Sequence, residues 1–241
     1  MKKFEIIYKH VGETPLEALE RFRAERIAAG HTDVADIPMT YAGRLDPMAE
    51  GELLILLGEE CKQKEKYLGL DKEYEIEVVY GIQTDTHDAL GLVTVVDPTK
   101  NSNNLPLPLE QYVGLFMQEY PAYSSRTVNG KQLHELARAG ELPEEMPTKE
   151  VEIYSIELLR QEVISGKDLK SRISEMIGRV NGDFRQEEIM VRWNEVLADN
   201  QSFPIAQLRV SCSSGTYMRS LAQRIGGFAL TIRRTKIFLP K

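Results

Sequence analysis

The segment KEYEIEVVYG, at residues 72–81, places the strongest constraint on what this chain can fold into. Tyr74, Ile76 and Val78 fall on one side of an extended chain, and the three glutamates that alternate with them fall on the other side. A period of two residues is that of a β-strand, and a strand with one apolar and one charged face is typical of an antiparallel sheet with one buried face. The segment therefore predicts a half-buried strand, whose partner strands must lie elsewhere in the chain.

Other stretches of the chain predict a mixture of further strands and helices. Strands are expected at residues 4–8, 53–57, 92–96, 150–164, 205–212 and 228–238. Helices are expected at residues 15–29, 59–68, 109–118, 130–140, 167–179 and 213–226, with loops at residues 31–52 and 97–108. Because strands and helices do not alternate as they do in parallel α/β proteins, we predict an α+β fold with a mixed, largely antiparallel central sheet flanked by helices and loops.

Length and composition are those of an ordinary globular protein. The chain has 241 residues, of which 42% are hydrophobic, so it can bury a sizeable core. Its longest strongly apolar run, residues 53–57, is far shorter than a membrane span, and its start lacks the apolar stretch of a signal peptide. We therefore expect a cytoplasmic protein. Cys61 and Cys212 lie far apart in the sequence, so we expect neither a metal site nor, in that compartment, a disulfide.

Charge is distributed unevenly along the chain. The net charge is −7, but residues 200–241 contain no acidic residue and carry a charge of +7. A basic segment on an acidic body indicates either an anionic partner held at one face or internal pairing with the acidic residues. Charge alone leaves both alternatives open.

A single aspartate stands out in the segment YAGRLDPMAEG, at residues 41–51. Asp46 precedes a proline, which favours an extended backbone and fixes the direction of the side chain. Gly43 and Gly51 allow unusual turns and a close approach by a ligand. A carboxylate held rigidly above the predicted buried strand suits nucleophilic or acid–base chemistry. The alternative is structural, because aspartate before proline is also a common turn or helix cap.

Two further segments each have a functional and a structural interpretation. Asp85, His87 and Asp88 in YGIQTDTHDALG could be metal ligands, but their spacing fits no closed site, and side-chain-capped turns are favoured. In RVSCSSGTYMRSLAQRIG, Cys212 alternates with inward-facing residues and is predicted to be a buried structural thiol rather than a nucleophile. Arg219 is expected in the first turn of a helix, where the helix dipole disfavours a cation, so a carboxylate or phosphate partner would explain it.

The segment QEYPAYSSRTVNGKQLHELARAG, at residues 118–140, interleaves aromatic and basic side chains. Aromatic rings beside cations suit the binding of unpaired nucleotides. The alternative is an amphipathic helix whose basic side chains are simply solvated.

Taken together, these segments resemble the TruB family of tRNA pseudouridine synthases. GRLDPMAEGELLILLGE is similar to that family's Gly-x-Leu-Asp-Pro-x-Ala-x-Gly-x-Leu motif, and KEYEIEVVYGIQTDTHDALG is similar to its second block. QEYPAYSSRTVNGKQLHELARAG and VSCSSGTYMRSLAQRIG resemble two later blocks, and KHVGETPLEAL resembles the lead-in. The resemblance is specific because the blocks follow the family order and cover nearly the whole chain.

The resemblance implies a fold, a reaction and a set of roles. It implies a single pseudouridine-synthase domain over residues 1–241 that acts, as a monomer without metal or cofactor, on a uridine in the T-arm of tRNA, at T-loop position 55. Asp46 would be the catalytic aspartate, Arg219 would pair with it, and Tyr74 would stack on the flipped base. Further contacts to the uridine and the RNA would come from Tyr41, Arg44, Arg126, Lys131, Ile232, Arg233 and Arg234.

The chain departs from the family pattern at several places. Tyr41 stands where the family has a histidine, and either Tyr41 replaces it or an extra stretch returns His31 to the site; the first alternative is preferred. Thr127 stands where the family usually has a lysine. The C-terminal PUA domain common in this family is expected to be absent, which would place more of the RNA binding on residues 200–241.

Two other functions compete with a synthase. An RNA-binding or RNA-folding protein of the same fold would show little turnover. The intact set of Asp46, Tyr74 and Arg219 argues against it, whereas the altered Tyr41 and the expected absence of the PUA domain leave it open. A carboxylate-dependent glycosidase is disfavoured, because such enzymes usually need two placed acids and no second acid stands out in the sequence.

Overall fold

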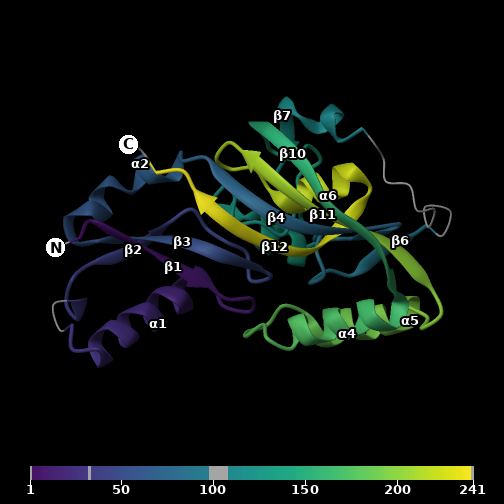
Figure 1. The fold of residues 1–241 in the computed structure, drawn as a ribbon, viewed down its shortest axis with the longest axis horizontal. Helices are drawn as coiled ribbons and strands as arrows, with labels where there is room; N and C mark the ends of the chain where they lie inside the picture. The colour runs from purple at the N-terminus through teal and green to yellow at the C-terminus, as the bar shows by residue number, and fades with distance from the viewer. Residues whose placement is uncertain (1, 32–33, 98–107, 240–241) are drawn as a thin grey trace.

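The fold is built on one long, curved sheet. The computed structural model describes residues 2–31, 34–97 and 108–239, and Figure 1 shows the sheet running across the molecule. Its strands follow the spatial order β1-β3-β12-β4-β11-β10-β7, and β2 pairs with β3. The bounds of these strands are β1 Phe4–Lys9, β2 Met39–Ala42, β3 Ala49–Leu57, β4 Lys72–Tyr80, β7 Gly114–Glu119, β10 Thr148–Ser165, β11 Ser202–Cys212 and β12 Gly227–Ile237.

Strand pairing in the described part of this sheet is antiparallel except between β3 and β12, which run parallel. Two small antiparallel ladders lie outside it, namely β5 Ile82–Thr84 with β6 Val93–Val96, and β8 Thr127–Val128 with β9 Lys131–Gln132. The mixed, largely antiparallel sheet that the sequence predicts is therefore confirmed, and so is the α+β class.

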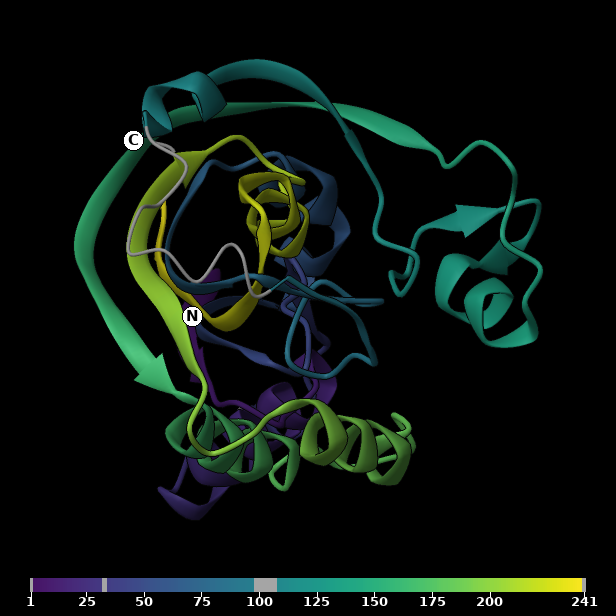
Figure 2. The same cartoon turned by 90° about the vertical axis from the view of Figure 1, so that its right-hand side faces the viewer.

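Helices flank the sheet. The α-helices are α1 Pro15–Ala28, α2 Lys64–Leu68, α3 Leu133–Ala139, α4 Gly166–Ile177, α5 Gln186–Val196 and α6 Met218–Ile225, and Gly58–Gln63 and Leu109–Tyr112 form short 3₁₀ helices. Figure 1 shows α1, α4 and α5 along one side of the sheet, and Figure 2 shows the sheet curving around α6. Within the described ranges, no helix is both long enough and apolar enough to cross a membrane.

The alternation that predicted β4 is confirmed by the packing of its side chains. Ile76 and Val78 are fully buried and pack with α6 in one core cluster, together with Tyr74. Val79 faces the opposite side and packs with α4 and α5 in a second cluster, which contains Trp193. The end of β4 is therefore buried on both faces, whereas its pattern predicted one buried face.

Helix α1 begins as its sequence predicts. The Thr14 hydroxyl accepts a hydrogen bond from the backbone N–H of Glu17 at 3.2 Å, and the Glu17 carboxylate accepts one from the backbone N–H of Thr14 at 2.6 Å. This reciprocal capping satisfies two N–H groups at the helix start, and Pro15 occupies the first helical position without losing a bond. The cap fixes the direction in which α1 leaves the sheet.

Strand β12 brings distant parts of the chain side by side. It lies between β3 and β4, with Ile232 opposite Ala49 of β3 and Arg234 opposite Tyr74 of β4. Because Ala49 follows Asp46 by three residues, this register places the loop of Asp46 beside Tyr74 and Ile232. The three segments converge although they are widely separated in the sequence.

A row of charged side chains crosses the face of the sheet opposite α6. Glu75 of β4 accepts hydrogen bonds from Arg209 of β11, at 3.2 Å, and from Arg233 of β12. Arg209 also pairs with Glu157 of β10 at 3.0 Å. Burial alone would raise the pKa of Glu75, but the hydrogen bonds from Arg233 and Arg209 outweigh that effect and lower it. A slip of one residue would turn these charges toward the core, so the row helps to fix the register.

The predicted helix at residues 109–118 is wrong. Leu109–Tyr112 form only a short 3₁₀ helix, and Gly114–Glu119 form strand β7, which pairs with the start of β10. Gly114 has a φ of +106°, a conformation that glycine adopts easily and that ends the helical turn. The partner strand, rather than the local sequence, decides the structure of this segment.

Other predicted boundaries also change. Residues 31–52, predicted as a loop, contain β2 and the start of β3. The helix predicted at residues 130–140 is the shorter α3, which follows the β8–β9 hairpin, and α5 has no counterpart among the predicted elements. Most of the predicted connection at residues 97–108 lies outside the described residues.

Replacing Glu75 with glutamine should destabilise the fold, because Arg209 and Arg233 both lose their charged acceptor. We expect the free energy of unfolding at pH 7, measured by urea denaturation, to fall by about 1–3 kcal/mol. The pKa of Glu75 is lowered in the folded state, so its carboxylate adds stability that is lost as the pH falls through that lowered value. The difference between wild type and variant should shrink accordingly at acidic pH.

The matched control is Glu157→Gln, which removes the other acidic partner of Arg209. The Glu157 side chain is 62% exposed, against 13% for Glu75, so its loss should change stability much less. Equal effects of the two substitutions would contradict the central place of Glu75 in the row.

Candidate active site

Asp46 lies on a tight loop that connects β2 with β3. Its carbonyl oxygen accepts a hydrogen bond from the backbone N–H of Ala49 at 3.0 Å, which closes a turn. Gly51 has a φ of +110°, and a Cβ atom there would lie 2.2 Å from the carbonyl oxygen of Arg234. Glycine is required at this position because the backbones of β3 and β12 approach closely. The close approach at Gly51 is made by a neighbouring strand.

Arg234 fastens this loop to the sheet. Its guanidinium donates hydrogen bonds to the carbonyl oxygens of Glu52 at 2.6 Å, of Gly43 at 3.0 Å and of Arg44 at 3.5 Å. The residue is only 1% exposed. Its donors are engaged with the main chain, but the residue also lines a cavity beside Asp46, and its contact with RNA stays a prediction.

The ion pair predicted between Arg219 and Asp46 is present. The Arg219 Nε atom donates to Oδ2 of Asp46 at 2.8 Å, and the Arg219 side chain is 3% exposed. Its other nitrogens donate to the carbonyl oxygens of Thr86 at 2.9 Å and of Tyr123 at 3.3 Å. The partner carboxylate accounts for a cation in the first turn of α6, where the helix dipole is unfavourable to it.

A second carboxylate, that of Asp88, flanks Arg219. Its Oδ2 atom lies 3.6 Å from Nε of Arg219, and its Oδ1 atom accepts from the Thr86 hydroxyl at 2.6 Å and from the backbone N–H of Leu90 at 3.0 Å. Burial raises the pKa of Asp88 to about 6, although Arg219 opposes the shift. This corrects the conclusion that no second acid stands out, because Asp88 lines the same cavity as Asp46.

Asp46 lies where two cavities adjoin. The first, which we name the β4 cavity, has a volume of about 310 Å³ and is lined by Asp46, Tyr74 and Ile232, with Lys72 and Lys149. Burial raises the pKa of Tyr74 and lowers that of Lys72 to about 8. The space beside the Asp46 carboxylate is thus bounded by an aromatic ring, an aliphatic side chain and two amines. A space of this kind suits a flat polar ring.

The second, which we name the α1 cavity, has a volume of about 460 Å³ and lies between the start of α1 and the Asp46 loop. Tyr41 and Arg44 line it, and Arg44 donates to the Tyr41 hydroxyl at 3.4 Å. His31 is exposed and does not line either cavity. Arg44, Leu45 and Asp46 line both cavities, so the two adjoin along this loop, and we refer to them together as the cleft.

Three other residues predicted to bind RNA lie outside the two cavities. Arg126 is exposed, and its guanidinium lies 5.1 Å from the ring centroid of Tyr120, which lines the β4 cavity. Lys131 is exposed on the β8–β9 hairpin and pairs with Glu141 at 3.0 Å. Arg233 belongs to the charged row on the other face of the sheet. Of the three, Arg126 alone adjoins the cleft.

Most of the basic side chains described in residues 200–241 are engaged within the protein. Arg209, Arg219 and Arg233 pair with acidic side chains, and Arg234 binds main-chain oxygens. The Arg224 guanidinium lies 4.2 Å from the centroid of an aromatic ring. Of the two alternatives that charge left open, internal pairing is therefore present for these arginines, and the larger share of RNA binding expected of this segment stays a prediction.

The TDTHD segment forms side-chain-capped turns, as the favoured interpretation predicted. The Thr84 hydroxyl donates to the carbonyl oxygen of Asp88 at 2.8 Å, and the Asp85 carboxylate accepts from the backbone N–H of Leu92 at 2.8 Å. In the described part of the chain, no group of three or more His, Cys, Asp or Glu residues is placed to hold a metal ion. Cys212 is fully buried, and burial raises the pKa of its thiol to about 11, as expected of a structural residue.

Among the residues of the α1 cavity that sequence reasoning missed are Phe184 and Arg185. They lie between α4 and α5, in a stretch for which the sequence suggested no role. Arg185 pairs with Asp85 at 2.8 Å although the two are 100 positions apart. Local sequence patterns do not reveal contacts between residues so far apart in the chain, so no sequence signal predicts this ion pair.

Comparison with known proteins identifies related chains. Residues 37–179 match the family model described as TruB family pseudouridylate synthase (N terminal domain). The tRNA pseudouridine synthase B of Aquifex aeolicus (strain VF5) is 30% identical, over 96% of this chain and 67% of that protein. The tRNA pseudouridine synthase B of Ralstonia pickettii (strain 12J) is 31% identical, over 96% of this chain and 61% of that protein. The chain thus spans about half to two thirds of the length of the curated relatives that it matches.

Solved structures with a detectable likeness are more distant. A chain of a Cbf5-Nop10-Gar1 complex aligns with 98% of this chain and 48% of its own length, with a TM-score of 0.48 and 15% identity. A chain of the archaeal box H/ACA sRNP Nop10-Cbf5 complex aligns with 98% of this chain and 47% of its own length, with a TM-score of 0.47 and 16% identity. Identities this low do not transfer the roles of residues.

Replacing Asp88 with asparagine should change how stability depends on pH. The pKa of Asp88 is about 6 in the folded protein, above its ordinary value of 3.8, so the folded state loses stability as the pH rises through about 6 and the buried group ionises. Asparagine does not titrate. Relative to the variant, the free energy of unfolding of the wild type should therefore fall by about 3 kcal/mol between about pH 4 and pH 7. Urea denaturation across that range measures it, and parallel profiles for the two proteins would contradict the buried acid.

Proposed function

Because the chain belongs to the TruB family of pseudouridylate synthases, we propose that it converts a uridine of tRNA, at T-loop position 55, into pseudouridine. The observation that carries the proposal is the Asp46–Arg219 ion pair beside a cavity that also holds Tyr74 and Ile232. Relatives named tRNA pseudouridine synthase B support tRNA as the substrate.

The proposed reaction is an isomerisation of one nucleotide. The N1–C1′ bond of the uridine breaks, the uracil turns, and its C5 atom bonds to C1′; C5 then releases its proton to solvent and N1 takes one up. The uridine must first leave the RNA stack and enter a pocket. In the proposed complex the β4 cavity receives the uracil, with the Tyr74 ring against its face and Ile232 against the other wall.

Asp46 supplies the reactive carboxylate in this proposal. It either attacks C1′ or takes the proton from C2′, and both routes require the charged form. Apolar surroundings disfavour a charged carboxylate, and a close guanidinium favours it. Arg219 is itself held by two main-chain oxygens and Asp88, so the pair keeps its geometry before RNA arrives, which is the condition for electrostatic stabilisation without reorganisation.

Arg44 and Tyr41 are proposed to contact the RNA backbone next to the target. Arg44 is exposed and lines both cavities, so a phosphate that follows the uridine out of the stack would lie close to its guanidinium. A bidentate contact of this kind is typical of arginine with phosphate. The Tyr41 hydroxyl, which accepts a hydrogen bond from Arg44, would orient that guanidinium.

Asp46→Asn should abolish the reaction and leave tRNA binding in place, because the substitution removes the carboxylate and preserves its shape. The measurement is tritium release from a tRNA transcript labelled with [5-³H]uridine, which we expect from the wild type and not from the variant. A transcript with cytidine at the T-loop position should give no release with either protein.

Each other outcome of this assay has a defined meaning. Release by both proteins would exclude Asp46 as the reactive group. Release from the cytidine transcript would exclude the T-loop position as the sole target. Binding of tRNA by a wild type that releases no tritium would identify the chain as an RNA-binding or RNA-folding protein of this fold.

Arg219→Lys should lower kcat by about 100-fold or more while KM changes little, because an ammonium keeps the charge but cannot span the contacts that the guanidinium makes. Single-turnover tritium release at saturating enzyme separates this effect from binding. The matched control is Ser220→Ala in the next position of α6, whose hydroxyl points away from Asp46 toward the carbonyl oxygen of Glu119 at 3.5 Å. An unchanged kcat in the lysine variant would contradict the proposed role.

A further inference from the structure

The connection between β10 and β11 is longer than the sheet requires. The two strands remain paired to their ends, where Ser165 lies opposite Ser202, so a two-residue turn could join them. Residues 166–201 instead form α4, a loop and α5. Figure 1 shows the two helices side by side below the sheet, with the loop between them directed toward α1.

Core packing accounts for the two helices and for part of the loop between them, where Val180 belongs to the second core cluster. Both helices bury apolar side chains in the second core cluster, among them Leu169, Ile173, Ile177, Ile189 and Trp193. Antiparallel helices are commonly joined by about 2–5 residues, whereas residues 178–185 separate α4 from α5. The last two residues of this loop, Phe184 and Arg185, reach the α1 cavity beside Asp46.

Arg185 is fixed in position on the cavity wall. Its φ of +63° lies in the left-handed region, which is uncommon for a residue with a side chain. Its guanidinium donates to the Asp85 carboxylate at 2.8 Å and stacks 4.4 Å from the ring centroid of Tyr123. Because Asp85 balances its charge, Arg185 offers a flat polar surface more than a free cation for phosphate.

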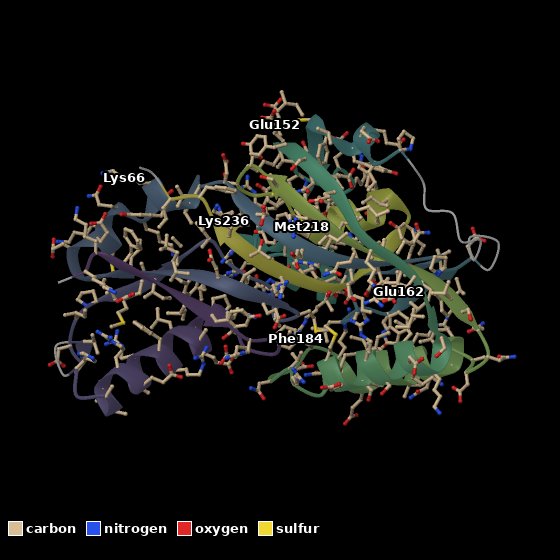
Figure 3. The ribbon with its side chains drawn as sticks, viewed as in Figure 1. Lys66, Glu152, Glu162, Phe184, Met218 and Lys236 are labelled. Carbon is tan, nitrogen blue, oxygen red and sulfur yellow. The ribbon has the colours of Figure 1, made fainter. Side chains whose placement is uncertain are left out.

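The same loop contacts helix α3, which also lines the α1 cavity. Arg138 of α3 donates to the carbonyl oxygen of Asp183 and lies 3.9 Å from its carboxylate. Phe184, labelled in Figure 3 on the part of the loop near the sheet, is partly buried against the second core cluster and lines the cavity. The Phe184 ring and the Arg185–Tyr123 stack therefore both line the α1 cavity.

We propose that the α1 cavity binds the base of the nucleotide adjacent to the target uridine, with Phe184 and the Arg185–Tyr123 stack as its contact surfaces. This inference rests on the proposed function: Asp46 and Arg44 line both cavities, so a uridine bound in the β4 cavity would bring its neighbouring nucleotide within reach of the α1 cavity. The cavity volume of about 460 Å³ is within the range of small-ligand sites. Rings and guanidinium planes hold unpaired bases by stacking.

The test uses a T-arm stem–loop RNA that carries 2-aminopurine on the 5′ or the 3′ side of the target uridine. The RNA is bound to the full chain carrying Asp46→Asn, so that no reaction occurs. Stacking quenches 2-aminopurine fluorescence, so we expect quenching at one of the two positions. Adding Phe184→Leu, which keeps the apolar volume and removes the ring, should abolish the quenching and raise the Kd about 5- to 150-fold. Arg185→Lys is the second variant. It should also reduce the quenching and raise the Kd.

The matched control is Phe22→Leu, because Phe22 is a partly buried phenylalanine of α1 that packs in a different cluster. It should leave both quenching and Kd unchanged. An absence of quenching at both positions, or quenching that survives both cavity variants, would overturn this site. Tritium release by the wild type would then leave the proposed function standing. Conversely, quenching that depends on Phe184, in a chain whose wild type releases no tritium, would retain the base site and overturn the synthase.

Discussion

A guanidinium buried between two carboxylates is the interaction on which the rest of the site depends. Removing the charge of Arg219 from water costs several kcal/mol, and only good hydrogen-bond geometry offsets that cost. Arg219 lies on α6, and its partners come from the loop before β3, from the turn after β5 and from the segment after β7. Each of these segments can move only by leaving part of a buried charge uncompensated, so one side chain fixes four parts of the chain relative to one another.

A second arginine, Arg234 of β12, holds the backbone of the Asp46 loop against the sheet. Arg234 binds three main-chain oxygens around the Asp46 loop, while Gly51 allows β3 to approach β12 closely enough for those contacts. Asp46 is therefore held at its carboxylate by Arg219 and at its backbone by Arg234. A reactive group supported in both ways needs little rearrangement when a substrate binds.

Local patterns in the sequence predicted those elements whose structure is decided locally. The alternation at residues 72–80 and the start of a helix at Pro15 both correspond to what the structure shows. Strand β7 was mispredicted because it exists through pairing with β10. The adjacent arginines show the same limit for the site: only the register of β12 turns Arg233 toward Glu75 and Arg234 toward the Asp46 loop.

The position of β12 has a consequence for the order of events during synthesis. It is the last of the described strands to be made, yet it lies between β3 and β4, which precede it by well over a hundred residues. At the usual rate of translation those two strands wait on the order of ten seconds with unpaired edges, which are open to wrong pairing. A nascent chain that has not reached β12 already carries Asp46 but has no Arg234 to anchor its loop. Of the two arginines that hold Asp46 and its loop, Arg219 is made before β12, and the contacts of Arg234 can form only once β12 has been made.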